Sequence, residues 1–325
     1  MRDSNLSWQK ILGDGFNSSS ELLQFLNLPI NNLLAVEKVF KTRVPRRFAS
    51  LMEQGNPNDP LLLQVLAQEK ELEKNPAYVR DPLGESSVNQ VPGLLHKYKG
   101  RVLLTITNVC AVNCRYCFRR HFPYQSNNPG KNGWPSAIDY IRKDDSIEEV
   151  IFSGGDPLLA SDAILAYLFE QIITIKHVKT IRFHTRIPIV LPERITSSFL
   201  QLLKKLPLKK VMVIHSNHAN ELDTYVEESC LALKNVGCHL LNQSVLLRGV
   251  NDSAHVLAKL SKRLFDCQVL PYYLHLLDKV DGAGHFDLPK EEAKMIYEEL
   301  QTLLPGYLVP RLACEEAGKS HKTLI

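Results

Sequence analysis

Val102-Leu103-Leu104-Thr105-Ile106-Thr107 is followed, after two residues, by Cys110-Ala111-Val112-Asn113-Cys114-Arg115-Tyr116-Cys117. The first stretch is a short run of branched apolar residues, which predicts a buried strand. Similar runs alternate with amphipathic stretches of helical spacing in the rest of the chain. The strand runs are Val102–Thr107, Val150–Phe152, Thr180–Phe183, Val211–Ile214, Leu240–Val245 and Val269–Tyr273, and the helical stretches are Asp162–Ile175, Ile195–Lys205, Glu221–Asn235, Ala254–Phe265 and Pro289–Leu304.

This alternation predicts an α/β fold with a parallel sheet. Six units in about 200 residues are too few for a complete eight-unit barrel, which needs about 250 residues, so we expect a partial (β/α)6 barrel. Residues 1–95 form a predicted helical arm, 96–305 the barrel and 306–325 a short final segment. Within the arm we expect one helix from Ser20, its N-cap, to Leu26 and another from Leu61 to Glu73.

The composition is that of a soluble globular protein. The chain has 325 residues, 44% apolar and 23% charged, with a formal charge of +4. So small a charge predicts no nucleic-acid partner. The sequence contains no apolar run of membrane-spanning length, and its first five residues lack the apolar part of a signal peptide. Seven cysteines, three of them crowded into one loop, indicate a reducing, cytoplasmic location.

The three cysteines of that loop predict a metal centre. Cys110, Cys114 and Cys117 have the spacing C-x3-C-x2-C, which is too compact for three independent roles. Three thiolates fit a [4Fe–4S] cluster that has one iron open to a ligand. The alternative is a zinc site completed by His121, although structural zinc sites tend to begin with C-x2-C.

The loop resembles the signature of the radical S-adenosylmethionine (SAM) superfamily, including the aromatic Tyr116 before the last cysteine. A second motif, Ser153-Gly154-Gly155-Asp156-Pro157, follows the next predicted strand. Its two glycines permit close approach of a ligand to the backbone. The resemblance implies a radical SAM barrel in which Tyr116, Gly154, Gly155 and Asp156 contribute to binding SAM.

Longer segments resemble the lysine 2,3-aminomutase family. They are Arg101–Leu104, Cys117–Arg120, Ser153–Asp156, His215–His218, Asn242–Asp252 and Pro271–Tyr273. The resemblance implies an isomerase that uses pyridoxal 5′-phosphate (PLP) beside SAM and the cluster. It implies Lys322, twelve residues after Val309-Pro310 and before Thr323, as the PLP lysine, with Lys319 as the rival. It also implies that Tyr98 and Arg101 lie near the PLP ring and phosphate.

The resemblance further implies the residues that bind lysine and SAM. Arg119 would hold the substrate carboxylate, for which a planar two-pronged donor is suited. Asp278 and Glu315 would hold the side-chain ammonium, so that L-lysine is the expected substrate. SAM would also contact His215, Gln243 and, as a weaker candidate, Arg186.

The short ending at Ile325, together with the run from Cys110 to Tyr124, resembles the branch of the family that acts with bacterial elongation factor P. That branch converts (S)-α-lysine to (R)-β-lysine, which a companion ligase attaches to elongation factor P. Three alternatives stay open at this point: another radical SAM aminomutase, a radical SAM enzyme without PLP, and a zinc-stabilised binding module.

Overall fold

A computed structural model describes residues 6–30, 33–123 and 130–325. The five N-terminal residues and Tyr124, to which two of the predictions refer, lie outside these ranges. The central feature is one ten-stranded sheet whose strand order follows the chain from β1 to β10. Within the described residues, no helix is both long and apolar enough to cross a membrane.

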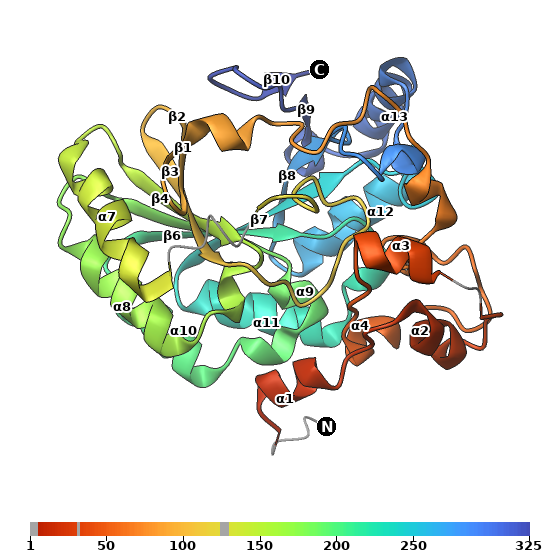
Figure 1. Cartoon of the computed structure of the whole chain (residues 1–325), viewed down its shortest axis with the longest axis horizontal. Helices are drawn as coiled ribbons and strands as arrows, with labels where there is room; N and C mark the ends of the chain where they lie inside the picture. The colour runs from red at the N-terminus through yellow and green to blue at the C-terminus, as the bar shows by residue number, and fades with distance from the viewer. Residues whose placement is uncertain (1–5, 31–32, 124–129) are drawn as a thin grey trace.

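All six predicted strands form the middle of this sheet, and each pairs in parallel with the next. They are β3 (Arg101–Thr107), β4 (Glu149–Gly154), β5 (Thr180–Thr185), β6 (Lys209–His215), β7 (Cys238–Val245) and β8 (Leu270–His275). The predicted helices are α8 (Asp162–Ile173), α10 (Ser197–Lys205), α11 (Thr224–Asn235), α12 (Ala254–Asp266) and α13 (Lys290–Leu303). Because β1 and β10 are the two ends of the sheet, it is an open, partial barrel, which confirms the predicted fold class (Figure 1).

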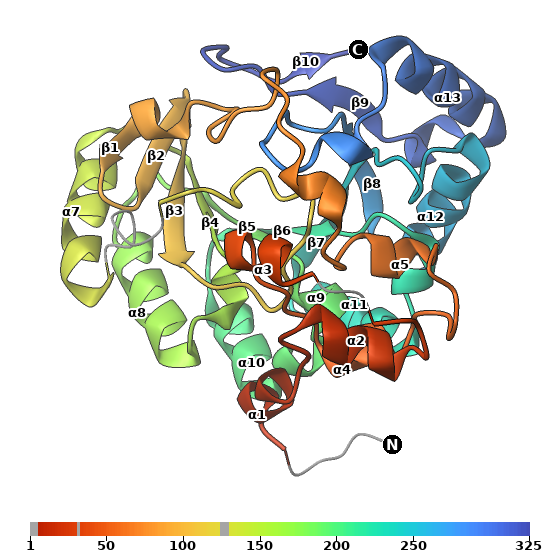
Figure 2. The ribbon, with the colours of Figure 1, turned by 45° about the vertical axis from the view of Figure 1, so that its right-hand side comes forward.

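The sheet extends beyond the six predicted strands. Ahead of β3 lies an antiparallel hairpin, β1 (Asn89–Val91) and β2 (Leu94–Tyr98), which turns at Gly93 with a φ of 82°. Beyond β8 lies β9 (Arg311–Cys314), parallel to it, and then the antiparallel β10 (Thr323–Leu324). These short strands lack a long apolar run, so the pattern that predicted the others did not indicate them. The C-terminal segment thereby joins the sheet (Figure 2).

Short helices make up the arm and the connections, and the helices of the arm gather beside α9 and α11 in Figures 1 and 2. The α-helices are α1 (Trp8–Gly13), α2 (Ser19–Phe25), α3 (Leu34–Val39), α4 (Arg46–Ala49), α5 (Pro60–Leu63), α7 (Gly130–Lys143) and α9 (Ile187–Val190). The 3₁₀ turns are η1 (Glu69–Leu72), η2 (Glu85–Val88), η3 (Pro157–Leu159), η4 (Pro192–Arg194), η5 (Ala219–Glu221), η6 (Gly284–Phe286) and η7 (Gly306–Leu308).

The arm corrects two predictions about helices. The N-cap of α2 is Ser18, whose hydroxyl accepts a hydrogen bond from the Glu21 amide, and not Ser20. The single helix predicted from Leu61 to Glu73 is wrong, because α5 ends at Leu63 and only η1 follows. The Gln64 carbonyl accepts a hydrogen bond from the amide of Arg115 at 2.8 Å, a partner outside the helix. A tertiary contact has overridden the helical pattern.

Buried charges join the arm to the cysteine loop. Glu71 of η1 accepts hydrogen bonds from both Arg115 and Arg120 at 2.6 Å. The three side chains are at most 1% exposed, and both guanidinium groups lie over the Phe40 ring. Because a buried charge is costly without a partner, Glu71 fixes the conformation of the loop that carries the cysteines.

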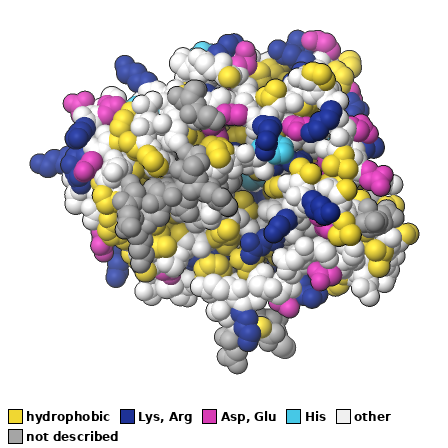
Figure 3. All heavy atoms as spheres, viewed as in Figure 1, with side chains coloured by type: hydrophobic (Ala, Val, Ile, Leu, Met, Phe, Trp, Pro, Cys, Tyr) yellow, Lys and Arg dark blue, Asp and Glu magenta, His cyan; other side chains and the backbone are white. Residues whose placement is uncertain are grey.

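On the face of the molecule shown in Figure 3, Lys and Arg side chains are interspersed with Asp and Glu.

Candidate functional site

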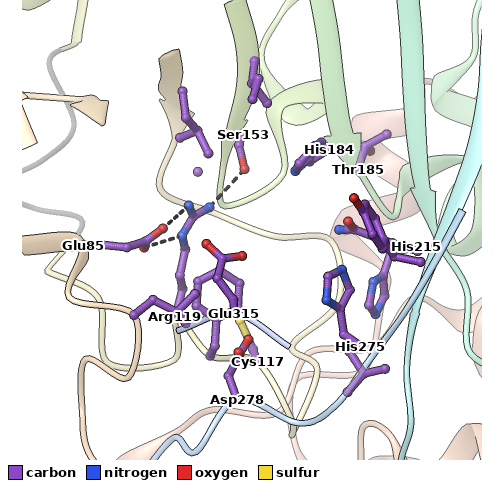
Figure 4. A pocket seen from close by; sticks show the side chains of 18 of the residues that line it. Glu85, Cys117, Arg119, Ser153, His184, Thr185, His215, His275, Asp278 and Glu315 are labelled. Atoms are coloured by element: carbon purple, nitrogen blue, oxygen red, sulfur yellow. Dashed lines mark hydrogen bonds and ion pairs between the residues drawn. The ribbon is translucent and has the colours of Figure 1, made fainter. Parts of the chain in front are cut away.

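One cavity of about 530 Å³ lies inside the open barrel, and every predicted site residue lines it. Side chains from the cysteine loop, from strands β2 to β8 and from the C-terminal segment line this space. Figure 4 shows those of the loop, of β4, β5, β6 and β8, and of Glu315 in the C-terminal segment. The predicted residues are Tyr98, Arg101, Cys110, Cys114, Tyr116, Cys117, Arg119, Gly154, Gly155, Asp156, Arg186, His215, Gln243, Asp278, Glu315 and Lys322. Residues from the whole length of the barrel thus share one site.

The three loop cysteines are free thiols at one side of this cavity. Burial and the neighbouring Cys117 raise the pKa of Cys110 well above its ordinary value. Burial and the proximity of Cys114 likewise raise the pKa of Cys117 to about 11. Three thiolates at this position need a positively charged centre to stabilise them. Three cysteines are also the donor set of a [4Fe–4S] cluster in which the fourth iron is open to another ligand. The residues present fit that group.

The zinc alternative does not fit the structure. His121, its proposed fourth ligand, has Nε2 at 3.0 Å from the backbone oxygen of Asp281. Across residues 6–30, 33–123 and 130–325, no three His, Cys, Asp or Glu side chains are placed to hold a single ion. A cluster differs in this respect, because separate thiolates bind separate iron atoms.

The glycine pair at the end of β4 also meets a requirement of backbone packing. A Cβ atom on Gly155 would lie 2.2 Å from the carbonyl oxygen of Val109, and one on Gly154 would lie 2.6 Å from that of Thr107. Gly154 also has a φ of 112°, which favours glycine. Both glycines line the cavity, but they are required because β4 packs tightly against the chain that enters the cysteine loop.

Asp156 joins the loop that follows β4 to the end of β5. Its carboxylate accepts hydrogen bonds from the Thr185 hydroxyl at 2.7 Å, the Arg186 amide at 2.8 Å and the Leu158 amide at 3.1 Å. Burial raises its pKa to about 6 in spite of these bonds. The contacts make Asp156 a support for Arg186.

Arg186 reaches the cysteine loop directly. Its Nη1 donates to the Cys114 sulfur and to the Tyr116 hydroxyl, both at 2.8 Å, and its Nη2 lies 3.0 Å from Glu221. The Tyr116 hydroxyl is also 2.8 Å from Nε2 of His215. The Nε of Arg186 is buried without a hydrogen-bond partner in the described part of the chain. A buried, unpaired donor beside the cysteines fits an anionic group such as the carboxylate of SAM.

The C-terminal segment brings Lys322 into the cavity. Its Nζ lies 2.5 Å from Glu315, which also accepts hydrogen bonds from Lys97 at 2.6 Å and Tyr98 at 2.7 Å. Burial alone would raise the pKa of Glu315, but Lys322 and Lys97 outweigh it and hold that pKa well below its usual range. The rival Lys319 instead pairs with Glu316 at 2.9 Å and is not among the residues that line the cavity. The geometry fits Lys322 as the anchor of PLP.

The cavity also contains a second carboxylate and an arginine with opposite charge. Burial and the nearby Glu315 raise the pKa of Asp278 to about 7. Arg119 lies between Glu85, which accepts two hydrogen bonds at 2.6 and 2.8 Å, and Ser153, whose hydroxyl is 3.0 Å from Nη1 (Figure 4). The cavity is therefore suited to a ligand that has both a negative and a positive group.

Comparisons with known proteins agree with this geometry. Residues 104–260 match the family model of the radical SAM superfamily. The chain is 50% identical to the L-lysine 2,3-aminomutase of Haemophilus influenzae over 321 residues, which cover 98% of this chain and 95% of that one. The chain belongs to the L-lysine 2,3-aminomutase family. The Escherichia coli aminomutase is 48% identical, with 98% and 94% covered, and that of Clostridium subterminale 39%, with 88% and 69% covered.

The predicted family, fold class and enzyme class, an isomerase, are thereby confirmed.

In this aminomutase-family chain, the cavity is also lined by residues that the sequence analysis missed, among them Glu85, Arg182, His184 and His275. Alternate residues of β5 are buried, and the intervening Arg182 and His184 face the cavity. That two-residue period could have indicated them. Burial lowers the pKa of His275 to about 3 and that of His184 well below its ordinary value, which favours the neutral form of each ring.

Proposed function

We propose that this aminomutase-family protein converts (S)-α-lysine to (R)-β-lysine with a [4Fe–4S] cluster, SAM and PLP. The observation that carries the proposal is that one cavity unites the three-cysteine loop, Lys322 and a pair of oppositely charged ends. When bound, the cluster with SAM supplies a radical that removes hydrogen, and PLP supplies the π system through which the amino group migrates. The protein supplies positions, charges and exclusion of water.

The three cofactors would occupy different walls of the cavity. Cys110, Cys114 and Cys117 would hold three irons of the cluster. For SAM we assign Arg186, His215 and Gln243, with Tyr116, Gly154, Gly155 and Asp156 shaping that wall. For PLP we assign Lys322 as the covalent anchor, and Tyr98 and Arg101 at the ring and phosphate; the Arg101 guanidinium lies 4.6 Å from the Tyr98 ring centroid.

The substrate would lie between Arg119 and the two carboxylates. Arg119 would bind the α-carboxylate, and Asp278 and Glu315 would bind the ε-ammonium. Glu315 pairs with Lys322 in the protein as described here. The ammonium of lysine would therefore compete with Lys322 and Lys97 for Glu315.

Anaerobic turnover tests the proposal. Protein reconstituted with iron and sulfide, and supplied with a reductant, SAM, PLP and L-lysine, should produce β-lysine. The Cys114→Ala variant, which removes one cluster ligand, should produce none. Absence of β-lysine from wild-type protein that retains iron, SAM and PLP binding would reject the substrate assignment.

Two finer statements stay predictions from the family resemblance: a supply of β-lysine for elongation factor P, and a cytoplasmic location. If the first is right, elongation factor P from cells that lack this protein should lose the mass of one β-lysyl group. Restoring the wild-type gene should restore the mass, whereas a gene carrying Lys322→Ala should not. Full modification in cells without the protein would contradict the link.

A further inference from the structure

The arginine that we assign to the substrate carboxylate is already bound to a carboxylate of the chain itself. Glu85 accepts from Nε of Arg119 at 2.8 Å and from Nη2 at 2.6 Å, the two-pronged geometry of the strongest arginine–carboxylate pairs. The two side chains are 9% and 10% exposed. Ser153 accepts from the third nitrogen at 3.0 Å. Both Glu85 and Arg119 line the cavity, where Figure 4 shows them facing each other.

Glu85 comes from the arm and not from a barrel strand. It is the first residue of η2, directly after Gly84, and its backbone amide donates to Asp81 at 3.0 Å. The barrel therefore supplies the arginine, and the arm supplies the charge that neutralises it.

A neutralised arginine attracts a second carboxylate less than an unpaired one does. Two carboxylates at one guanidinium also repel each other, and this repulsion is weakly screened at a buried site. A substrate carboxylate must therefore displace Glu85 or bind beside it, and either route lowers its affinity. Glu85 thus has two opposing effects: its charge repels a second carboxylate, and its hydrogen bonds hold Arg119 in a fixed orientation.

We propose that Glu85 competes with the substrate carboxylate for Arg119 and so determines specificity. A carboxylate alone binds weakly, and an amino acid is retained only when its other end meets Asp278 and Glu315. The inference rests on the proposed function of Arg119.

Binding of three ligands to the PLP-loaded protein tests this inference, with no reductant or SAM present so that turnover cannot occur. L-lysine has both charged ends, L-norleucine has the same carbon chain without the ε-amine, and cadaverine has the amines without the carboxylate. In Glu85→Gln, L-lysine and L-norleucine should each bind at least about tenfold more tightly, while cadaverine should be unchanged. Glu85→Asp, which keeps the charge on a shorter side chain, should give a smaller increase for the same two ligands.

A matched control separates a local effect from a general change in cavity charge. Glu149 pairs at 2.8 Å with Arg182, another arginine that lines the cavity. Glu149→Gln removes the same unit charge away from Arg119 and should change L-norleucine binding less than Glu85→Gln does.

Two results would overturn the inference. Weaker binding of L-lysine and L-norleucine in the Glu85 variants would mean that Glu85 only orients Arg119, and equal changes for all three ligands would mean a general disturbance. Failure of the wild type to bind L-lysine would instead count against the proposed function. The change in L-norleucine affinity between the wild type and the Glu85 variants would still test the competition for Arg119.

Discussion

Raising the pH from about 6 to about 8 should tighten the binding of L-lysine relative to L-norleucine. The group responsible is Asp278, whose pKa is raised to about 7 by burial and by the neighbouring Glu315. An ammonium group is bound by the ionised carboxylate and not by the neutral acid. The ε-amine of lysine stays protonated over this range, because its ordinary pKa is about 10.4. Binding therefore follows the ionisation of Asp278.

The magnitude follows from the titration curve. With a pKa of about 7, roughly one-tenth of the Asp278 side chains are ionised at pH 6 and roughly nine-tenths at pH 8. The ratio of the two affinities, L-lysine over L-norleucine, should therefore rise by up to about tenfold. Norleucine has the same α-amine and carboxylate, so dividing by its affinity removes the effects of other titrating groups, including Asp156.

Calorimetric titrations of both ligands into the PLP-loaded protein, at several pH values between these limits, measure the ratio. Asp278→Asn should give a low ratio that does not change with pH. A ratio that is flat in the wild type, or a rise that persists in Asp278→Asn, would refute the assignment of Asp278 to the ammonium.

Three further predictions concern the anchor, the arm and the glycine pair. In Lys322→Ala, reduction with borohydride should leave no PLP covalently attached to the protein, whereas Lys319→Ala should retain the attached PLP. The reverse result would show that Lys319 is the anchor. Glu71→Gln should lower the free energy of unfolding in urea by about 3–5 kcal/mol, because two buried guanidinium groups lose their anionic partner, and a loss below about 1 kcal/mol would contradict this. Gly155→Ala should reduce the iron bound after anaerobic reconstitution, because its Cβ would collide with the Val109 carbonyl; iron at the wild-type level would show that the loop tolerates the change.

The parallel core of the sheet was predictable because its strands are short apolar runs separated by amphipathic helices. Burial on both faces produces that pattern, and all six predicted strands are present. The break after Leu63 was not predictable, because it depends on a hydrogen bond from Arg115, which is distant in sequence. The β1–β2 hairpin and the strands β9 and β10 were missed because they are short and lack a long apolar run.

The site was predictable where a motif fixes the chemistry. The cysteine spacing and the family resemblance indicated residues that the fold then brings to one cavity. They did not indicate what those residues contact. The pairing of Arg119 with Glu85 depends on how the arm lies against the barrel, and no local pattern in the sequence contains that information. The close approach of the Val109 carbonyl to Gly155 is a tertiary contact that the motif did not indicate.

The account depends most on the three loop cysteines holding a cluster. Iron and acid-labile sulfide, measured after anaerobic reconstitution and combined with electron paramagnetic resonance of the reduced protein, test this directly. The account predicts about four iron and four sulfide per chain, lost in Cys114→Ala and retained in Cys230→Ala, whose thiol is buried away from the cavity. Wild-type protein without iron and sulfide, or a cluster that survives replacement of all three loop cysteines, would contradict it.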